Sequence, residues 1–330
     1  MSDHPLLQDF PWAQAPILAN APMSGMATSE LAAAVISAGG LGLIGFLGNP
    51  RMLDVQLRLA KALLLHDQEA QLPPQLREWG RTQTRTRTRI FHPSGPAIVW
   101  LYFGETKDFV AWAEGIRATS PRTKGWVQAG SVDATMQTAQ ACHPDALVLQ
   151  GIDAGGHGHA RGSSDITLIP EVSDVFIGNV FVGSRRIPLV AAGGIVDGRG
   201  VAAAMALGVS GVVMGTRFLG AQETEITQEY RRETLSASDG GQSTVRSRIF
   251  DERWVPSAWP EMYDGRCQKN ACYDECERGV SIDEIRKRLL WAGTGMGLVK
   301  NIENARDIVQ GVRGDAKQRL RDTFLVRCSS

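Results

Sequence analysis

Short apolar runs alternate with longer segments of helical character along the first two thirds of the chain. The runs cover Ile17–Ala19, Leu41–Phe46, Ala97–Phe103, Trp126–Gln128, Ala146–Gln150, Leu189–Ala192 and Val212–Met214. Runs that are apolar throughout, instead of alternating with polar residues, are typical of parallel strands covered on both faces. The pattern therefore predicts a parallel α/β protein.

The segments between these runs carry signals for helix ends. Thr28 and Ser29 precede a helix predicted over Glu30–Ala38, while Ser131 and Asp197 stand where they can cap the helices that follow them. Each predicted helix leads into the next apolar run within a few residues. This rhythm leaves two architectures, a closed (β/α)8 barrel or a doubly wound sheet.

Seven apolar runs are one fewer than a barrel needs, and the long gap between Phe46 and Ala97 has room for another strand. A helix is predicted over Arg51–Leu65. Beyond it, Arg81–Arg89 alternates threonine with arginine or glutamine, which is compatible with a strand that has a threonine face. Because nothing apolar fills the inward face, an exposed loop is the favoured interpretation.

The character of the sequence changes after Thr216. Helices are predicted over Glu223–Ala237, Ser281–Trp291 and Ile302–Thr323, with an aperiodic segment over Val255–Gly265 and a turn over residues 239–242. We predict that residues 1–222 form the barrel, with residues 71–91 atypical and weakly ordered. Residues 223–330 are predicted to form a helical and loop extension packed on it.

Glycine is over-represented, with 36 among 330 residues against an average usage of about 7%. The informative glycines follow predicted strands, as Gly193-Gly194, Gly215-Thr216 and a loop over residues 151–158. Glycines after the last strands of a barrel are typical of a phosphate site built from backbone N–H groups. A phosphorylated cofactor is therefore expected. Gly40–Gly45 also matches GxGxxG, but it follows a helix instead of a strand, so a dinucleotide fingerprint is not favoured.

His157 lies in the glycine-rich loop and is the candidate for proton chemistry, since histidine titrates near neutrality. His159, two residues further on, is the alternative. Asp153 would either orient a histidine or hold the loop by accepting backbone hydrogen bonds, and the residues alone leave both roles open.

Composition narrows the class of protein. Lys and Arg total 35 and Asp and Glu total 35, so the formal net charge of zero gives no support to nucleic acid or an anionic membrane as a partner. The N-terminus shows no secretory pattern, and the longest apolar stretch is interrupted by Ser37 and five glycines, so a cytoplasmic protein is expected. Three of the five cysteines, at positions 267, 272 and 276, lack a fourth ligand nearby, so no metal site is expected.

Three segments, taken together and in this order, resemble the nitronate monooxygenase family, formerly called 2-nitropropane dioxygenases. They are Ala21-Pro22-Met23 with the helix and strand that follow, Gln150–His157, and Leu189–Phe218. The resemblance implies an FMN-dependent (β/α)8 barrel that oxidises an alkyl nitronate or nitroalkane with O2, giving a carbonyl compound and nitrite.

The resemblance also assigns roles to individual residues. Ala21, Pro22 and Met23 would line the flavin ring, and Gln150, Gly155 and Gly156 would border the ring or the ribityl chain. The phosphate would be held by Gly193, Gly194, Gly215 and Thr216. His157 would act as the base or as a group that positions the substrate.

The chain departs from the family where an apolar third strand is expected, because Gln71–Gln75 and the Arg/Thr segment stand there. A barrel with a defective third strand is one consequence. Two other functions stay open: an NAD(P)H-dependent flavin reductase on the same scaffold, such as an enoyl-ACP reductase II-like or quinone reductase enzyme, and a degenerate FMN-binding barrel without turnover. The substrate chain length and the oligomeric state are not predicted.

Overall fold

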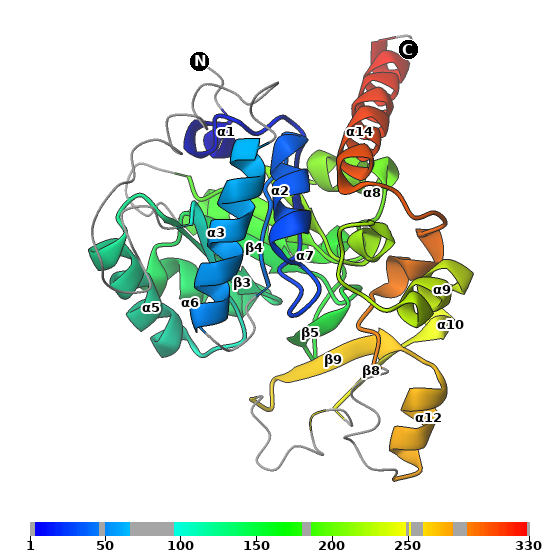
Figure 1. Cartoon of the computed structure of the whole chain (residues 1–330). Coiled ribbons are helices and arrows are strands. Elements are labelled where there is room, and N and C mark those ends of the chain that lie inside the picture. The colour runs from blue at the N-terminus through cyan, green and yellow to red at the C-terminus, as the bar shows by residue number, and fades with distance from the viewer. Residues whose placement is uncertain are drawn as a thin grey trace.

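The computed structural model describes residues 4–45, 50–66, 96–179, 186–248, 251, 260–279 and 289–328. Its centre is a curled parallel sheet of six strands in the order β1-β7-β6-β4-β3-β2, with helices around the outside (Figure 1). The strands are β1 (Ile17–Asn20), β2 (Ile98–Leu101), β3 (Lys124–Ala129), β4 (Ala146–Gln150), β6 (Leu189–Ala192) and β7 (Gly211–Met214). Six of the seven predicted apolar runs therefore form strands.

The seventh run, Leu41–Phe46, behaves differently from the prediction. Among the described residues of this run only Leu41 forms a β-bridge, parallel to Ala19. Further along the run, the side chain of Asn20 pairs with the backbone of Leu43 in place of a strand. Its Oδ1 accepts from the Leu43 N–H at 2.9 Å and its Nδ2 donates to the Leu43 carbonyl at 2.7 Å. A primary amide presents the same donor and acceptor as a peptide group, so it satisfies the buried backbone without a ladder.

Helices α2 (Ser29–Ser37), α5 (Thr106–Thr119), α6 (Val132–Cys142), α7 (Asp165–Asn179) and α8 (Gly198–Ala206) follow strands or strand-like runs. The predicted caps Ser131 and Asp197 are confirmed, because their side chains accept backbone N–H bonds from the first turns of α6 and α8. Thr28 stands at the N-cap of α2 but makes no side-chain capping bond. The helix predicted over Arg51–Leu65 is α3 (Pro50–His66).

Both faces of β1, β4, β6 and β7 are buried, as the continuous apolar runs predict, whereas β2 is only partly buried among the described residues. Along β1, Ile17 and Ala19 belong to a cluster inside the curled sheet, whereas Leu18 belongs to the larger cluster between the sheet and its helices. A short helix, α1 (Pro5–Asp9), delivers Phe10 to the inner cluster, where its ring lies 6.0 Å from that of Trp126. The strand amino ends are thereby covered, and the opposite end is left for ligands.

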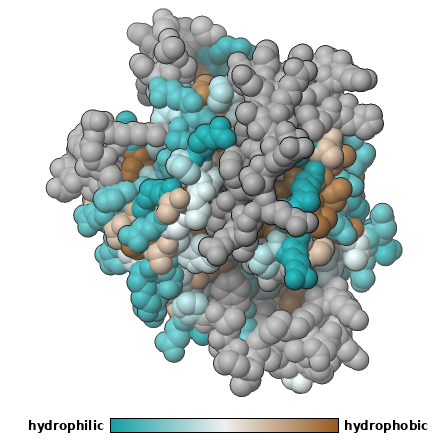
Figure 2. Space-filling view, turned by 60° about the vertical axis from the view of Figure 1, so that its left-hand side comes forward, coloured by the Kyte–Doolittle hydropathy of each residue, from teal (hydrophilic) through white to brown (hydrophobic). Residues whose placement is uncertain are grey.

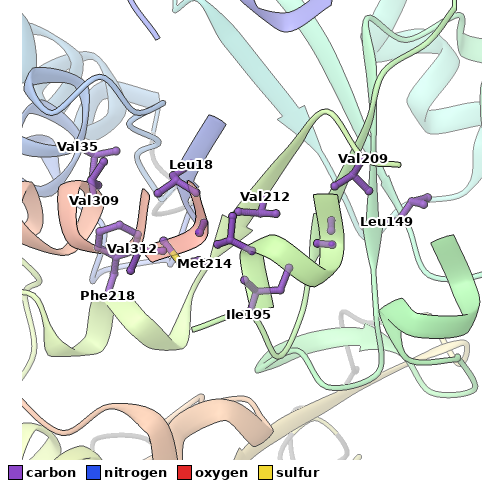
Figure 3. Packing of buried hydrophobic residues seen from close by; sticks show 14 of the residues in the cluster. Leu18, Val35, Leu149, Ile195, Val209, Val212, Met214, Phe218, Val309 and Val312 are labelled. Carbon is purple, nitrogen blue, oxygen red and sulfur yellow. The ribbon is translucent and has the colours of Figure 1, made fainter. Parts of the chain in front are cut away.

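The outer cluster also includes the C-terminal helix α14 (Ala305–Cys328). Figure 3 shows Val309 of α14 beside Val35 of α2, with Met214 and Phe218 nearby. The predicted helix over Ile302–Thr323 therefore exists with shifted ends. It packs against α8 and α2.

A second, antiparallel sheet joins the loop after β4 to the C-terminal third of the chain. Its order is β5-β9-β8, with β5 (Gly156–His159), β8 (Thr244–Ser247) and β9 (Tyr263–Gln268) at the lower side of Figure 1. The segment predicted to be aperiodic thus ends in the first part of a strand. Pairing with β5 makes this strand, which no internal alternation signals.

Other predictions in the C-terminal part need correction. The helix predicted over Glu223–Ala237 begins only at Gln228 (α9, Gln228–Ser236), and the side chain of Thr227 caps its first turn. The turn predicted over residues 239–242 is instead the start of a short helix, α10 (Gly240–Ser243). Most of the helix predicted over Ser281–Trp291 lies outside the described residues, and its described end is not helical. The atypical residues 71–91 also lie outside the described residues.

The surface visible in Figure 2 mixes polar side chains with smaller apolar areas. Exposed apolar side chains of α3 include Met52, Val55 and Leu59. Among the helices that the structure describes, none combines the length and the apolar character needed to cross a membrane.

Candidate active site

The residues predicted to bind a cofactor follow the carboxyl ends of four strands. Ala21 follows β1, Gln150 ends β4, Gly193 follows β6 and Gly215 follows β7. Since parallel strands end on the same edge, these residues gather at one mouth of the curled sheet. The strand order places β1, β7, β6 and β4 side by side.

The loop after β6 can be built only from glycine. Gly193 has φ +129° and Gly194 has φ +70°, conformations that L side chains rarely adopt. A Cβ on Gly193 would lie 2.9 Å from the Gly151 carbonyl oxygen, and one on Gly194 would lie 3.0 Å from Asp153 Cβ. The two glycines therefore let the loops after β4 and β6 come into direct contact.

The backbone after β6 and β7 has donors to offer. Among the described residues, the N–H groups of Gly194, Gly215 and Thr216 have no backbone or side-chain acceptor. Three such donors next to the ends of adjacent strands form a polar cradle suited to an anion. The Thr216 hydroxyl is engaged, because it accepts from the Gly293 N–H at 2.9 Å.

Gly155 and Gly156 have different surroundings. A Cβ on Gly155 would lie 2.5 Å from the backbone of Ala292 and Gly293, so this glycine allows the C-terminal segment to pack onto the loop. Gly156 has φ +74° and would find no atom within 4 Å. Of the two, Gly156 alone borders open space.

Gln150 ties β5 to the barrel. Its Oε1 accepts from Gln128 Nε2 at 2.9 Å, and its Nε2 donates to the carbonyl of His157 at 3.0 Å. Close packing reinforces this arrangement, since a Cβ on Gly158 would lie 2.5 Å from Gln150 Oε1. The backbone that carries His157 is thereby attached to strand β4.

The side chain of His157 lies in a largely enclosed aromatic setting. Its Nε2 is 2.8 Å from Asp251 Oδ1, and the His157 and Asp251 side chains are 13% and 5% exposed. The ring of Trp291 lies 4.8 Å from the imidazole, tilted by 43°, and the ring of Phe103 meets it edge-on at 5.8 Å. A histidine, a carboxylate and two aromatic rings thus converge at the mouth of the barrel.

Sequence reasoning missed three of the side chains that surround His157. Asp251 is 94 residues away along the chain, and no motif marks it. Phe103 ends the apolar run of β2 with φ +58°, an uncommon conformation for a bulky residue that the apolar pattern does not reveal. Trp291 lies shortly before a 3-10 helix, η4 (Thr294–Leu298), and no motif marks it.

His159 has a different environment from His157. Its ring meets Tyr263 edge-on at 5.2 Å and covers Gly130. Burial, and then the positive charge of Arg246, lower the pKa of His159, so its neutral form is favoured. Arg246 of β8 also donates to the carbonyls of Gly158 and His159 and pairs with Asp264 of β9, which links the three strands of the second sheet.

Of the two roles left open for Asp153, the contacts favour holding the loop. Its Oδ1 accepts from the Thr294 hydroxyl at 3.0 Å, and its backbone carbonyl accepts from the Thr294 N–H at 3.0 Å. Asp153 also affects the neighbouring carboxyl of Asp165. Burial, and secondly the charge of Asp153, raise the pKa of Asp165 from 3.8 to about 8. No group of three or more metal-ligating side chains occurs in the described ranges.

Comparison with known proteins identifies the family. The family model described as nitronate monooxygenase matches residues 122–313, more than half of the chain. The chain belongs to the nitronate monooxygenase family. The nitronate monooxygenase npaC of Metarhizium robertsii is 37% identical over 94% of both chains, and the nitronate monooxygenase of Neurospora crassa is 36% identical over 94% of this chain and 92% of its own.

Solved structures agree on the fold of this nitronate monooxygenase family member. FabK from Thermotoga maritima superposes with a TM-score of 0.72 at 22% identity, covering 98% of this chain and 99% of its own. A nitroalkane oxidase from Streptomyces ansochromogenes reaches 0.65 at 18% identity, covering 94% and 98%. The (β/α)8 barrel, one of the two architectures that the apolar runs allow and the one that the resemblance implies, is confirmed, and the protein is an oxidoreductase of this family.

Proposed function

We propose that the protein oxidises alkyl nitronates with O2 to carbonyl compounds and nitrite, with bound FMN as the cofactor and His157 as the base that prepares neutral nitroalkanes. Family membership supports nitronate oxidation. The observation that carries the assignment to His157 is its place at the barrel mouth, beside Asp251 and between aromatic rings.

The residues at the mouth fit a flavin phosphate. The N–H groups after β6 and β7 would donate to its oxygens, and the glycines there leave the backbone accessible. Ala21 lies beside Gly215, with 3.4 Å between its Cβ and a Cβ built on the glycine, so Ala21-Pro22-Met23 would border the ring next to the phosphate. When bound, the flavin would supply the electron transfer to O2.

The chain's own residues would supply position, exclusion of water and a proton acceptor. A nitronate is already deprotonated at carbon, whereas a neutral nitroalkane must lose a proton from that carbon. His157 would take this proton, because a neutral imidazole nitrogen carries a basic lone pair and histidine is the side chain most often used as a general base. Trp291 and Phe103 would cover the reacting carbon and keep water away from it.

A first experiment tests the cofactor and the reaction. The purified protein should show a flavin absorbance spectrum, release FMN on denaturation, and consume O2 with propyl nitronate in the absence of NAD(P)H. Colourless protein that stays so after FMN is added would support a barrel without turnover. Rapid flavin bleaching by NADH or NADPH under anaerobic conditions, with no O2 uptake on nitronate, would support the reductase alternative.

A second experiment tests the base. His157→Ala should lose most of its kcat/KM on 1-nitropropane, by about 100-fold or more, while propyl nitronate oxidation falls much less. Only the neutral substrate needs a proton removed. Equal losses on both substrates would refute the assignment of His157 as base.

We also propose that residues 1–222 form the barrel and residues 223–330 an extension of it. Pairing of β9 with β5 and packing of α14 on α8 and α2 support an extension that packs on the barrel. The extension would then contribute Asp251 and Trp291 to the site.

A further inference from the structure

Asp251 stands in a position to control the chemistry of His157. Its Oδ1 is 2.8 Å from Nε2 of the imidazole, and both side chains are largely withdrawn from solvent. Its second oxygen, Oδ2, is buried and has no hydrogen-bond partner among the described residues. A buried carboxylate is stable only if a donor faces it. A hydrogen on Nε2 of His157 is therefore favoured over a lone pair on that nitrogen.

We propose that Asp251 is a positioning residue that keeps the hydrogen of neutral His157 on Nε2, so that Nδ1 is the nitrogen that removes the proton from a neutral nitroalkane. The inference rests on the proposed function, in which His157 is the base. In a neutral imidazole one nitrogen carries the hydrogen and the other carries the basic lone pair. The partner of Nε2 therefore decides which nitrogen is basic.

Neighbouring side chains restrict rotation of the His157 ring. The backbone of His157 pairs with Gly265 of β9, and a Cβ on Gly265 would lie 2.4 Å from the Trp291 ring. Glycine at this position therefore allows Trp291 to approach the imidazole. The Phe103 ring also contacts the imidazole, edge-on. Between these two aromatic rings, the imidazole has little freedom to turn Nδ1 toward Asp251.

Asp251 would also act after the proton has moved. Proton transfer to Nδ1 makes His157 an imidazolium whose Nε2–H faces the carboxylate. The charge that develops would then be balanced across a short hydrogen bond in a site with little water. A nitronate substrate brings no proton to transfer, so this contribution would be absent when a preformed nitronate is oxidised.

The kinetic test compares the two substrate forms. In Asp251→Asn and Asp251→Ala, we expect kcat/KM for 1-nitropropane to fall by about tenfold or more, chiefly in kcat, while propyl nitronate oxidation changes by less than about threefold. Asp145→Asn is the matched control, because Asp145 is a partly buried carboxylate paired with Lys124 at the opposite end of β4. It should leave both activities unchanged.

The spectroscopic test does not depend on activity. Proteins labelled with 15N-histidine should show His157, identified by the loss of its signals in His157→Gln, with its hydrogen on Nε2 in the neutral form and with slow exchange of that hydrogen. Asp251→Ala should remove the slow exchange. It should also let part of the neutral hydrogen move to Nδ1, whereas removal of a carboxylate without influence on the tautomer would leave that hydrogen on Nε2. The wild-type spectrum remains informative if the variants fold poorly.

Two results would overturn the proposal. One is a wild-type spectrum with the neutral hydrogen on Nδ1, and the other is equal loss of activity on 1-nitropropane and propyl nitronate in both Asp251 variants. Failure of the proposed function would look different. In that case His157→Ala would lower both activities equally, or the wild type would not oxidise nitronate, whatever the tautomer spectrum shows.

Discussion

Asp165 should make the stability of the protein depend on pH in a direction opposite to that of most carboxylates. It begins α7 beside Gly151, and both its carboxylate oxygens are buried without a side-chain or backbone partner among the described residues. Burial, and secondly the charge of Asp153, raise the pKa of Asp165 from 3.8 to about 8. The nearby Gly151 N–H acts in the opposite direction and lowers this pKa, although its hydrogen bond goes to the Ala192 carbonyl.

The sign follows from counting protons. Below pH ~4 the carboxyl is protonated in both the folded and the unfolded chain. Between pH ~4 and ~8 the unfolded chain ionises Asp165 while the folded chain keeps it protonated, so the free energy of unfolding falls as the pH rises. Above pH ~8 the folded carboxyl ionises too, and the loss stops growing.

The magnitude can be bounded from the same shift. Each pKa unit corresponds to about 1.4 kcal/mol, so the three units between pH 5 and pH 8 give a ceiling of ~4 kcal/mol. Asp165 as a whole residue is only partly buried, and solvent screening lowers this figure. Asp165→Asn, which cannot ionise, should therefore gain ~2 kcal/mol or more over the wild type between pH 5 and pH 8.

Urea unfolding at about pH 5, 6.5 and 8 would measure the difference in the free energy of unfolding between Asp165→Asn and the wild type. Asp174→Asn is the matched control, because Asp174 is exposed on the same helix. Other titrating groups contribute equally to all three proteins and cancel in the differences. A gain that is the same at all three pH values, or that Asp174→Asn reproduces, would refute the reasoning.

Two further substitutions test what holds the barrel together. Asn20→Leu should destabilise the protein by ~2–4 kcal/mol in urea unfolding, because the buried N–H and carbonyl of Leu43 lose both partners; a loss below ~1 kcal/mol would contradict this. Arg313→Met should cost ~2–4 kcal/mol, since the buried guanidinium donates to the carbonyls of Ala38 at 2.8 Å, Gly39 at 2.9 Å and Pro16 at 3.4 Å. Arg313→Lys should recover only part of this loss, as one ammonium group replaces the guanidinium fork.

Several features of the fold were predictable because their causes are local. Continuous apolar runs reveal strands covered on both faces, and Ser131 and Asp197 reveal helix starts because a cap acts within three residues. The single β-bridge at Leu41 was less predictable. Its cause is the side chain of Asn20, which pairs with Leu43 from another strand.

The candidate site also has some features that the sequence predicts and others that it does not. The glycines after β6 and β7 and His157 in the loop after β4 are visible in the sequence, because strand ends and glycine-rich loops recur at the ligand-binding edge of a barrel. Which loop contacts which is not visible. Gly155 faces Ala292, and Gly194 faces Asp153, only once the chain has closed.

The sequence by itself determined the parallel α/β class, the edge at which its loops converge and the histidine placed there, and its resemblance to a family pointed to the barrel. Only the tertiary structure decided that β5 pairs with β9 and that His157 meets Asp251 and Trp291. The physical reason is one of range. Periodicity and capping report interactions over a few residues, whereas a contact across 94 residues depends on how the C-terminal segment folds back over the barrel.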